Sequence, residues 1–116
     1  IISLKGFVKD KKLIFKNANL FINASLWEGL PNALVQSINY NVFPICSDAP
    51  GGNMEVIKNG RFGISFKTND EKDLQNKITK FLNKRLKLNN KSRIKHLHDY
   101  TELKSNQKYL EIINKL

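Results

Sequence analysis

Residues 20–47 read LFINASLWEGLPNALVQSINYNVFPICS, and this stretch decides the fold class. A short apolar run stands at each end, at residues 20–24 and 43–47, and residues 32–39 between them have the spacing of an amphipathic helix. Neither apolar run alternates with polar residues, which is typical of strands that are covered on both faces. A strand, a helix and a second strand in this order predict two parallel strands joined by a right-handed crossover.

The same alternation continues on both sides of this stretch. Strands are predicted at residues 1–4, 20–24, 43–47 and 62–66, and helices at residues 10–18, 32–39, 51–57, 70–86 and within 92–116. The inward-facing positions should be Leu13, Ile14 and Ala18 in the first helix, Leu34, Val35 and Ile38 in the second, and Leu74, Ile78, Phe81 and Leu82 in the fourth. We therefore predict an α/β fold with a Rossmann-like parallel sheet, flanking helices and a helical C-terminal tail.

The length and the charge of the chain suggest how it is organised. Its 116 residues suit a single domain, with an α/β core over residues 1–69 and a basic helical tail over residues 70–116. The 20 Lys and Arg outnumber the 10 Asp and Glu, and the net charge of +10 favours an anionic partner. Eight Lys or Arg and no acidic residue lie between Lys77 and Lys95. This basic stretch is either the solvated face of a core-facing helix or a surface attracted to an anionic membrane.

Composition also argues against several kinds of site. Aromatic residues are not interleaved with the basic ones, so a nucleic-acid partner is not expected. No apolar run approaches the roughly 20 residues of a membrane span, and no leader pattern is present. Cys46 is the only cysteine, and its apolar neighbours predict a packed thiol in a cytoplasmic protein. His96 and His98 would diverge by about 200° on a helix, so we expect surface histidines rather than a metal site.

The junction between the first strand and the helix of residues 32–39 is the candidate binding site. In open α/β sheets, ligands bind beyond the carboxyl ends of the strands. Pro31 suits the first position of a helix, so the amides from Asn32 to about Leu34 should lack partners and favour a phosphate. Glu28 precedes the helix, where its carboxylate can reach a sugar hydroxyl. A Pro-Asn helix start is also ordinary loop chemistry, and the residues alone leave both interpretations open.

Other residues near this junction have structural interpretations. The glycines in residues 50–52 (PGG) lack the Lys and Ser/Thr of a phosphate-binding P-loop, so we expect a tight turn at the rim of the crevice. Asp48 should have a turn or capping role, and Glu55 should orient the turn at residues 50–52. Trp27 should pack under the loop.

Four stretches resemble one enzyme family. SLWEGLPNALVQS at residues 25–37 resembles the sugar-nucleotide motif of retaining glycosyltransferases of family four, also called group 1, which have the GT-B fold. Further resemblances are SLKGFV at residues 3–8, ANLFINAS at 18–25 and FPICSDAPGGNMEVIKNGRFGISF at 43–66. The resemblance covers residues 1 to about 75. It implies part of the C-terminal nucleotide-sugar-binding half of a GT-B enzyme, with the N-terminal acceptor domain outside this chain.

The resemblance implies a role for each matched residue. Glu28 corresponds to the catalytic glutamate that contacts the donor sugar. Gln36 stands where the family usually has a glutamate that binds the ribose, and an amide can still hydrogen-bond there without the charge. The residues implied to hold the donor sugar and diphosphate are Gly29, Leu30, Pro31, Asn32, Ala33 and Leu34, and those near the base are Gly6, Phe7 and Val8. The resemblance implies no metal and no other cofactor.

We therefore expect a hexosyltransferase that uses a nucleotide sugar, retains the anomeric configuration and builds a bacterial surface glycan or glycolipid such as lipopolysaccharide. It should be cytoplasmic or peripheral on the inner face of the membrane, and this part of it alone should be inactive. The alternative is a non-catalytic basic module that binds an anionic membrane or a nucleic acid. Polyanion binding should weaken steeply as salt rises, whereas a nucleotide pocket should prefer a particular base.

Overall fold

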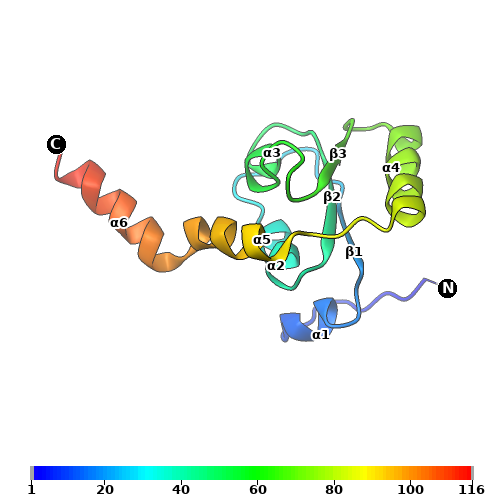
Figure 1. Ribbon diagram of the computed structural model, residues 1–116, viewed down its shortest axis with the longest axis horizontal. Coiled ribbons are helices and arrows are strands. Elements are labelled where there is room, and N and C mark those ends of the chain that lie inside the picture. Colours follow the sequence, from blue (N-terminus) through cyan, green and yellow to red (C-terminus); the bar gives the residue numbers. More distant parts are fainter. Residues whose placement is uncertain (1, 116) are drawn as a thin grey trace.

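The computed structural model describes residues 2–115 and has a parallel sheet between two layers of helices (Figure 1). The strands are β1 (Leu20–Asn23), β2 (Phe43–Ser47) and β3 (Ile64–Phe66), in the spatial order β1-β2-β3. Both pairs are parallel, with Ile45 of β2 opposite Ile22 on one side and Ile64 on the other. This arrangement confirms the α/β prediction and the parallel pairing of β1 with β2.

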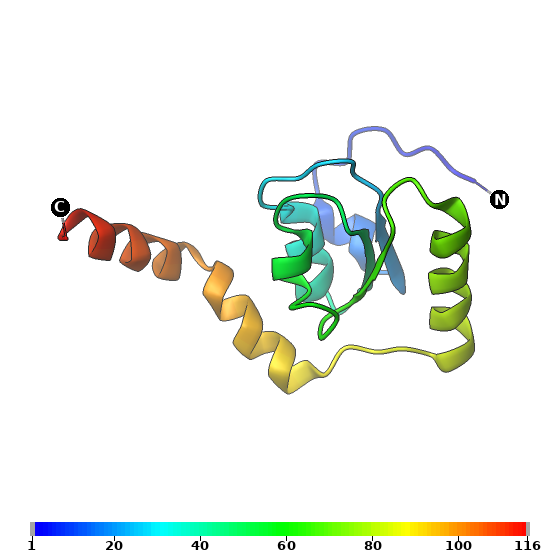
Figure 2. The ribbon, with the colours of Figure 1, turned by 90° about the horizontal axis from the view of Figure 1, so that it is seen from above.

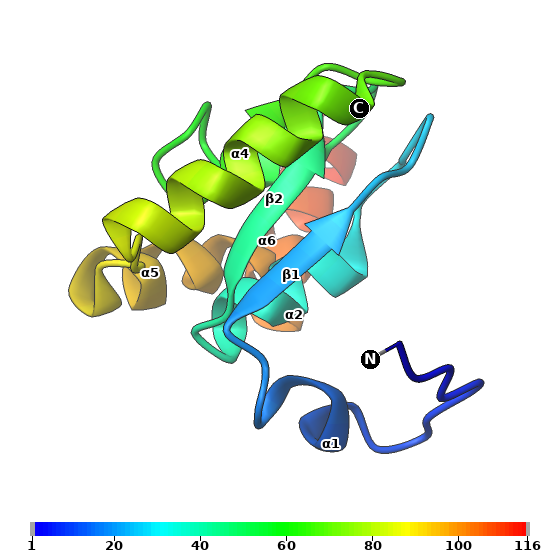
Figure 3. The same cartoon turned by 90° about the vertical axis from the view of Figure 1, so that its right-hand side faces the viewer.

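Helices cover both faces of the sheet. They are α1 (Lys11–Phe15), α2 (Asn32–Asn39), α3 (Asn53–Val56), α4 (Glu71–Lys84), α5 (Asn90–Leu97), the 3-10 helix η1 (His98–Tyr100) and α6 (Glu102–Ile113). In Figures 2 and 3, α4 lies on one face, and α2 and α3 lie on the other. Helix α5 packs against α2, and α6 contacts η1 and extends away from the body (Figure 1). Within residues 2–115, no helix is both long and apolar enough to cross a bilayer.

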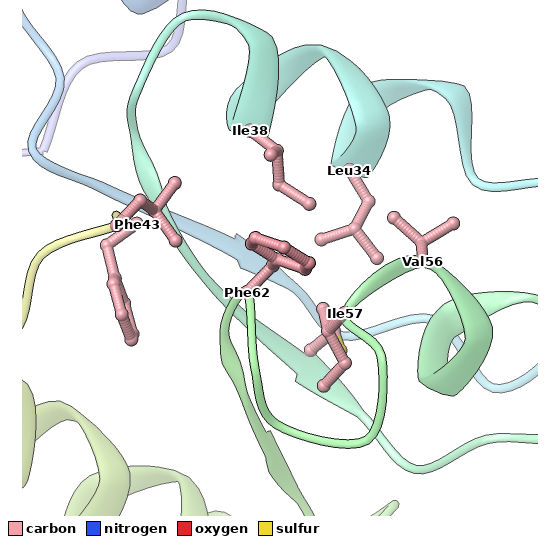
Figure 4. Packing of buried hydrophobic residues seen from close by; sticks show 8 residues of the cluster. Leu34, Ile38, Phe43, Val56, Ile57 and Phe62 are labelled. Carbon is pink, nitrogen blue, oxygen red and sulfur yellow. The ribbon is translucent and has the colours of Figure 1, made fainter. Parts of the chain in front are cut away.

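The core lies between the sheet and the α2–α3 layer. Figure 4 shows Phe62 next to Leu34 and Ile38 of α2, with Val56 and Ile57 beside them. All five side chains are buried, which confirms the predicted inward positions of Leu34 and Ile38. Burial of these side chains stabilises the fold by roughly 1.5–3 kcal/mol each.

Two buried groups join the layers around this core. Phe43 of β2 packs on Phe81 of α4 with 5.3 Å between the ring centroids, and so attaches α4 to the sheet. Cys46 is fully buried as predicted, and burial raises the pKa of its thiol to about 12.

The predicted strand at residues 1–4 is wrong for the described residues 2–4. This segment is not paired with any strand, and Leu4 is 95% exposed. Ile1 lies outside the described residues. A strand needs backbone partners on a neighbouring strand, and β-forming side chains cannot supply them.

The first helix is present, but its predicted apolar face is wrong. Asp10 caps α1, and its side chain accepts a hydrogen bond from the Lys12 N–H at 2.9 Å. Phe15 is the buried residue of this helix, whereas Leu13 and Ile14 are exposed. The Phe15 ring stacks on Tyr40 with 5.3 Å between centroids, so aromatic packing decides which face of this short helix turns inward.

The expected surface position of His96 is also wrong. Its side chain is 3% exposed and stacks on Phe62 with 4.4 Å between the ring centroids. The ring nitrogen Nε2 lies 2.6 Å from the carbonyl oxygen of Val56. His96 therefore joins α5 to the core, and desolvation in this position lowers its pKa.

Candidate functional site

Two loops meet where β1 and β2 end. Residues 25–31, the Glu28 loop, follow β1, and residues 50–52, the glycine turn, lie between β2 and α3. The Glu28 N–H donates to the Pro50 carbonyl oxygen at 3.3 Å, and the Gly52 N–H donates to the Gly29 carbonyl oxygen at 2.9 Å. Glu28 and Gly51 form an isolated parallel bridge. The two loops therefore resume the β1–β2 pairing beyond the strands, at the carboxyl end of the sheet.

Glycine is required for this close approach. A Cβ atom on Gly51, whose φ is +120°, would lie 1.6 Å from the Glu28 carbonyl oxygen. A Cβ atom on Gly52 would lie 2.5 Å from the Gly29 carbonyl oxygen. The expected turn is therefore present, and its glycines allow the Glu28 loop to lie directly against it.

The carboxylate of Glu28 is held by a neighbouring hydroxyl. Ser25 Oγ lies 2.6 Å from Glu28 Oε1 and 2.6 Å from Asn23 Oδ1. A hydroxyl has one proton, so Ser25 donates to one of these oxygens at a time. Asn23 Oδ1 also accepts a hydrogen bond from the Ser25 N–H at 3.3 Å. Ser25 therefore links the Glu28 side chain to the end of β1.

A buried amide extends this link to β2 and α3. Asn53 is fully buried, and its Nδ2 donates to the Ser47 carbonyl oxygen at 3.0 Å. Its Oδ1 accepts a hydrogen bond from Asn23 Nδ2 at 3.3 Å, and Ser47 Oγ donates to the Ser25 carbonyl oxygen at 2.5 Å. We call the set Asn23, Ser25, Glu28, Ser47 and Asn53 the Glu28 network.

The sequence analysis missed the four other members of this network, of which Ser25 contacts Glu28 directly. The available signal was a set of small polar residues at the ends of two predicted strands and at the start of the helix after the glycine turn. Because buried polar groups are normally hydrogen-bonded, such residues at one end of a sheet are candidates for a shared network.

The start of α2 differs from the predicted geometry. Pro31 is the N-cap rather than the first helical residue. The Asn32 N–H donates to the Leu30 carbonyl oxygen at 2.9 Å, and the Leu34 N–H donates to the Pro31 carbonyl oxygen at 2.9 Å. The expectation that both amides lack partners is therefore wrong, because a tight turn at proline already satisfies them. Among the described residues, the N–H groups of Gly29, Leu30 and Ala33 have no hydrogen-bond partner within the chain.

The structure does not bring all predicted site residues together. Gln36 is partly buried on α2 and lines a depression between α2 and the α5–η1 segment. No hydrogen bond joins Gln36 to Glu28 in the described part of the chain. The segment of residues 6–8 lies away from the Glu28 loop (Figures 1 and 3), and Gly6 and Val8 line a depression together with Leu13 and Ile14 of α1.

The three structural expectations near the site have different outcomes. Asp48 Oδ1 accepts hydrogen bonds from the Thr68 N–H and Oγ1, both at 2.8 Å, and so joins the segments after β2 and β3 as a turn residue. The Thr68 N–H is the main cause of the lowered pKa of Asp48.

Trp27 is 72% exposed, so its expected packing under the loop is wrong. Glu55 is exposed, and its side chain forms no hydrogen bond with residues 2–115. Asn53, just after the turn, instead joins the start of α3 to Ser47 at the end of β2.

Comparison with known proteins gives matches to one family. Residues 2–99 match the family model described as Glycosyl transferases group 1. The chain is 35% identical over 54 residues to an uncharacterized glycosyltransferase of Methanocaldococcus jannaschii, a match that covers 47% of this chain and 13% of the relative.

A second relative is from Campylobacter jejuni. It is the GalNAc-alpha-(1->4)-GalNAc-alpha-(1->3)-diNAcBac-PP-undecaprenol alpha-1,4-N-acetyl-D-galactosaminyltransferase, which is 31% identical over 78 residues. This match covers 67% of the chain and 22% of the relative. The chain thus spans 13% and 22% of the two curated relatives. The family match includes both the Glu28 loop and the glycine turn.

Proposed function

The chain belongs to the group 1 glycosyltransferases, and from this membership we propose that it is the donor-binding part of a retaining hexosyltransferase. The donor is a nucleotide sugar, and the acceptor is a glycan or glycolipid. The observation that carries the proposal is the Glu28 carboxylate, held 2.6 Å from the Ser25 hydroxyl beside N–H groups that have no partner within the described chain.

The proposed roles follow from the chemistry of these groups. A fixed carboxylate accepts hydrogen bonds from sugar hydroxyls, and its orientation needs no rearrangement when the donor binds. The N–H groups of Gly29, Leu30 and Ala33 donate to the sugar and to the diphosphate, at the positive end of α2. Because these groups and basic residues outside this chain balance the charge of the diphosphate, the proposal assigns no metal.

Gln36 and residues 6–8 complete the proposed donor site. Gln36 binds the ribose through its neutral amide. Residues 6–8 contact the base, which requires this segment to approach the Glu28 loop in the intact protein. Asn32 and Gln36 are four residues apart on α2 and share one face of the helix.

The acceptor side of the proposal rests on a relative. The name of the Campylobacter jejuni enzyme describes the transfer of N-acetyl-D-galactosamine to a saccharide on undecaprenol diphosphate. We propose a lipid-linked saccharide as the acceptor class and the assembly of a bacterial surface glycan as the role. This places the enzyme in the cytoplasm, at the inner face of the membrane.

Calorimetric titration of the intact protein tests the site. Glu28→Gln should lose most of its turnover and keep its affinity for the nucleoside diphosphate, because that product has no hexose for the carboxylate to hold. Gln36→Ala should weaken the binding of nucleoside diphosphate and nucleotide sugar alike, by about 1 kcal/mol for one neutral hydrogen bond. Gln36→Glu should keep both affinities.

The controls separate local from general effects. Glu111→Gln, on the exposed face of α6, removes the same charge and should change neither turnover nor binding. Equal loss of both ligands in a folded Glu28→Gln variant would refute the sugar role. Unchanged nucleotide affinity in Gln36→Ala would remove the ribose role.

A further inference from the structure

A basic depression lies at the amino end of the sheet, away from the Glu28 loop. It has a volume of about 630 Å³ and lies between the turn before β3 and the α5–η1–α6 segment. Its cationic residues are Lys58 and Arg61 on the turn and Lys95 and Lys104 on the helices, and it is also lined by Phe62, Ser92, Ile94, His96, His98 and Asp99. Because the turn leads into β3, this depression and the Glu28 loop lie at opposite ends of the strands.

The cations of this depression are not neutralised by the protein. Four Lys or Arg side chains face one acidic residue, Asp99. Over residues 2–115, the salt bridge found joins Lys77 to Asp73 on α4, so none of the four cations is paired with a carboxylate. A concave surface with unpaired charges of one sign concentrates ions of the other sign.

Arg61 is held in place by two contacts. Its guanidinium carbon lies 5.6 Å from the centre of the Phe62 ring, and its Nη2 donates to Ser92 Oγ at 3.4 Å. An arginine that stacks on an aromatic ring presents its remaining N–H groups in a fixed plane. Such a fork matches two oxygens of a phosphate group.

The floor of the depression is formed by packed aromatic rings. His96 stacks on the buried Phe62 with an angle of 2° between the ring planes, and Tyr100 contacts His96 edge-on at 5.2 Å. His96 Nδ1 is buried and has no hydrogen-bond partner in the described part of the chain. The cationic side chains therefore line a depression whose base is already filled by packed rings.

From these observations we propose that the basic depression binds the phosphate group of a second ligand, with Arg61 and Lys58 on one wall and Lys95 and Lys104 on the other. The site lies at the opposite end of the strands from the Glu28 loop, and it borders the depression at Gln36, with which it shares Ile94 and His98. The same phosphate chemistry is offered by a lipid headgroup and by a soluble phosphate ester.

Binding experiments on the intact protein distinguish these sources. The soluble probe is glycerol 3-phosphate, measured by calorimetric titration. The membrane probe is a vesicle of phosphatidylglycerol and phosphatidylcholine, measured by co-sedimentation against vesicles of phosphatidylcholine alone. Binding of the soluble probe supports a soluble phosphate ester, and binding only to the phosphatidylglycerol vesicles supports a lipid headgroup.

A matched pair of variants tests the location. Lys58→Gln/Arg61→Gln should reduce binding of the active probe by about tenfold or more, as expected when two charged hydrogen-bond donors are lost. Lys80→Gln/Lys84→Gln removes the same charge from exposed positions on α4 and should change binding less than about twofold. Lys95→Gln tests the opposite wall independently, in case the double variant does not fold.

Three results would overturn the proposal. The first is the absence of binding to either probe at physiological salt. The second is an equal loss of binding in the α4 control, which would show diffuse attraction to the net charge. The third is a comparable loss of nucleoside diphosphate affinity in Lys58→Gln/Arg61→Gln, which would make the depression part of the donor site. Failure of the Glu28 and Gln36 predictions alone would leave this site unaffected.

Discussion

Replacing Gly51 by alanine should displace the Glu28 loop from the carboxyl end of the sheet. The added Cβ atom would lie 1.6 Å from the Glu28 carbonyl oxygen and 2.7 Å from its carbonyl carbon. Non-bonded heavy atoms need about 3.5 Å, so one of the two backbones must move by roughly 2 Å. The side chains here cannot absorb this shift, because the atoms that collide belong to the main chain.

The energetic cost has two parts. Gly51 has a φ of +120°, and a non-glycine residue in such a conformation costs about 1–3 kcal/mol. Displacement of the loop also breaks the hydrogen bond of 3.3 Å from Glu28 to Pro50 and the one of 2.9 Å from Gly52 to Gly29, each worth about 1 kcal/mol. We expect Gly51→Ala to lose at least about 3 kcal/mol, a large share of the 5–15 kcal/mol typical of a domain.

Two other glycines separate the two parts of this cost. Gly60 has a φ of +104°, and a Cβ atom there would meet nothing closer than 3.9 Å, so Gly60→Ala reports conformational strain alone. A Cβ atom on Gly29 would meet nothing within 4 Å, so Gly29→Ala should change stability by less than about 1 kcal/mol.

Urea unfolding gives the stability of each variant, and amide hydrogen exchange gives the local effect. The Gly52 N–H donates across the two loops, so its exchange should accelerate in Gly51→Ala and not in Gly60→Ala. Suppose that Gly51→Ala is no less stable than Gly60→Ala and that the amide exchange rate of Gly52 is unchanged. The two loops would then not lie in the close contact described here.

Two further predictions concern single side chains. Ser25→Ala should lower kcat about tenfold and leave nucleoside diphosphate affinity nearly unchanged, because it frees the Glu28 carboxylate without removing it. Ser25→Thr, which keeps the hydroxyl, should retain turnover, and Ser105→Ala on the exposed face of α6 should have no effect. An equal loss of kcat in all three variants would contradict the role of the hydrogen bond between Ser25 and Glu28. Desolvation lowers the pKa of His96 in the folded protein. The unfolded chain therefore binds a proton at His96 more readily than the folded protein does. The free energy of unfolding should fall as the pH drops below the ordinary histidine pKa of 6.5 towards the lowered value. Urea midpoints at about pH 7.5 and about pH 5.5 should differ in the native protein and differ less in His96→Gln; the same pH dependence in both would refute this origin.

The sequence predicted the elements that have strong local signals. The bounds of α2 and β2 agree with the predictions, because apolar spacing and proline or glycine mark their ends. The predicted location of the Glu28 loop at the carboxyl end of β1 was correct for a similar reason: the order strand, loop, helix fixes which end of a parallel sheet the loop occupies.

The errors come from tertiary partners that local patterns do not encode. Residues 2–4 have β-forming side chains but no neighbouring strand. The five residues of α1 are too few for periodicity to define a face, and Phe15 packs inward on Tyr40. His96 is polar, but the approach of α5 to Phe62 buries it.

The specific contacts of the Glu28 network do not follow from local patterns, although its small polar residues at the strand ends were a signal of a shared network. Asn23 and Asn53 are 30 residues apart, and Ser47 is 22 residues from the Ser25 carbonyl that it contacts. Their proximity depends on the register in which Asn23 stands opposite Cys46. A shift of one residue in that register would turn the side chains of β1 to the opposite faces and separate these groups.

The length of the sheet is compatible with the two anionic sites that we propose. The five residues of β2 span roughly 16 Å at about 3.3 Å each. The strand thus separates the Glu28 loop at its carboxyl end from the basic depression near its amino end by about two Debye lengths at physiological salt. Charges that are exposed at one end are therefore largely screened from the other, and a phosphate bound by Arg61 should not strongly repel a diphosphate group bound near Glu28.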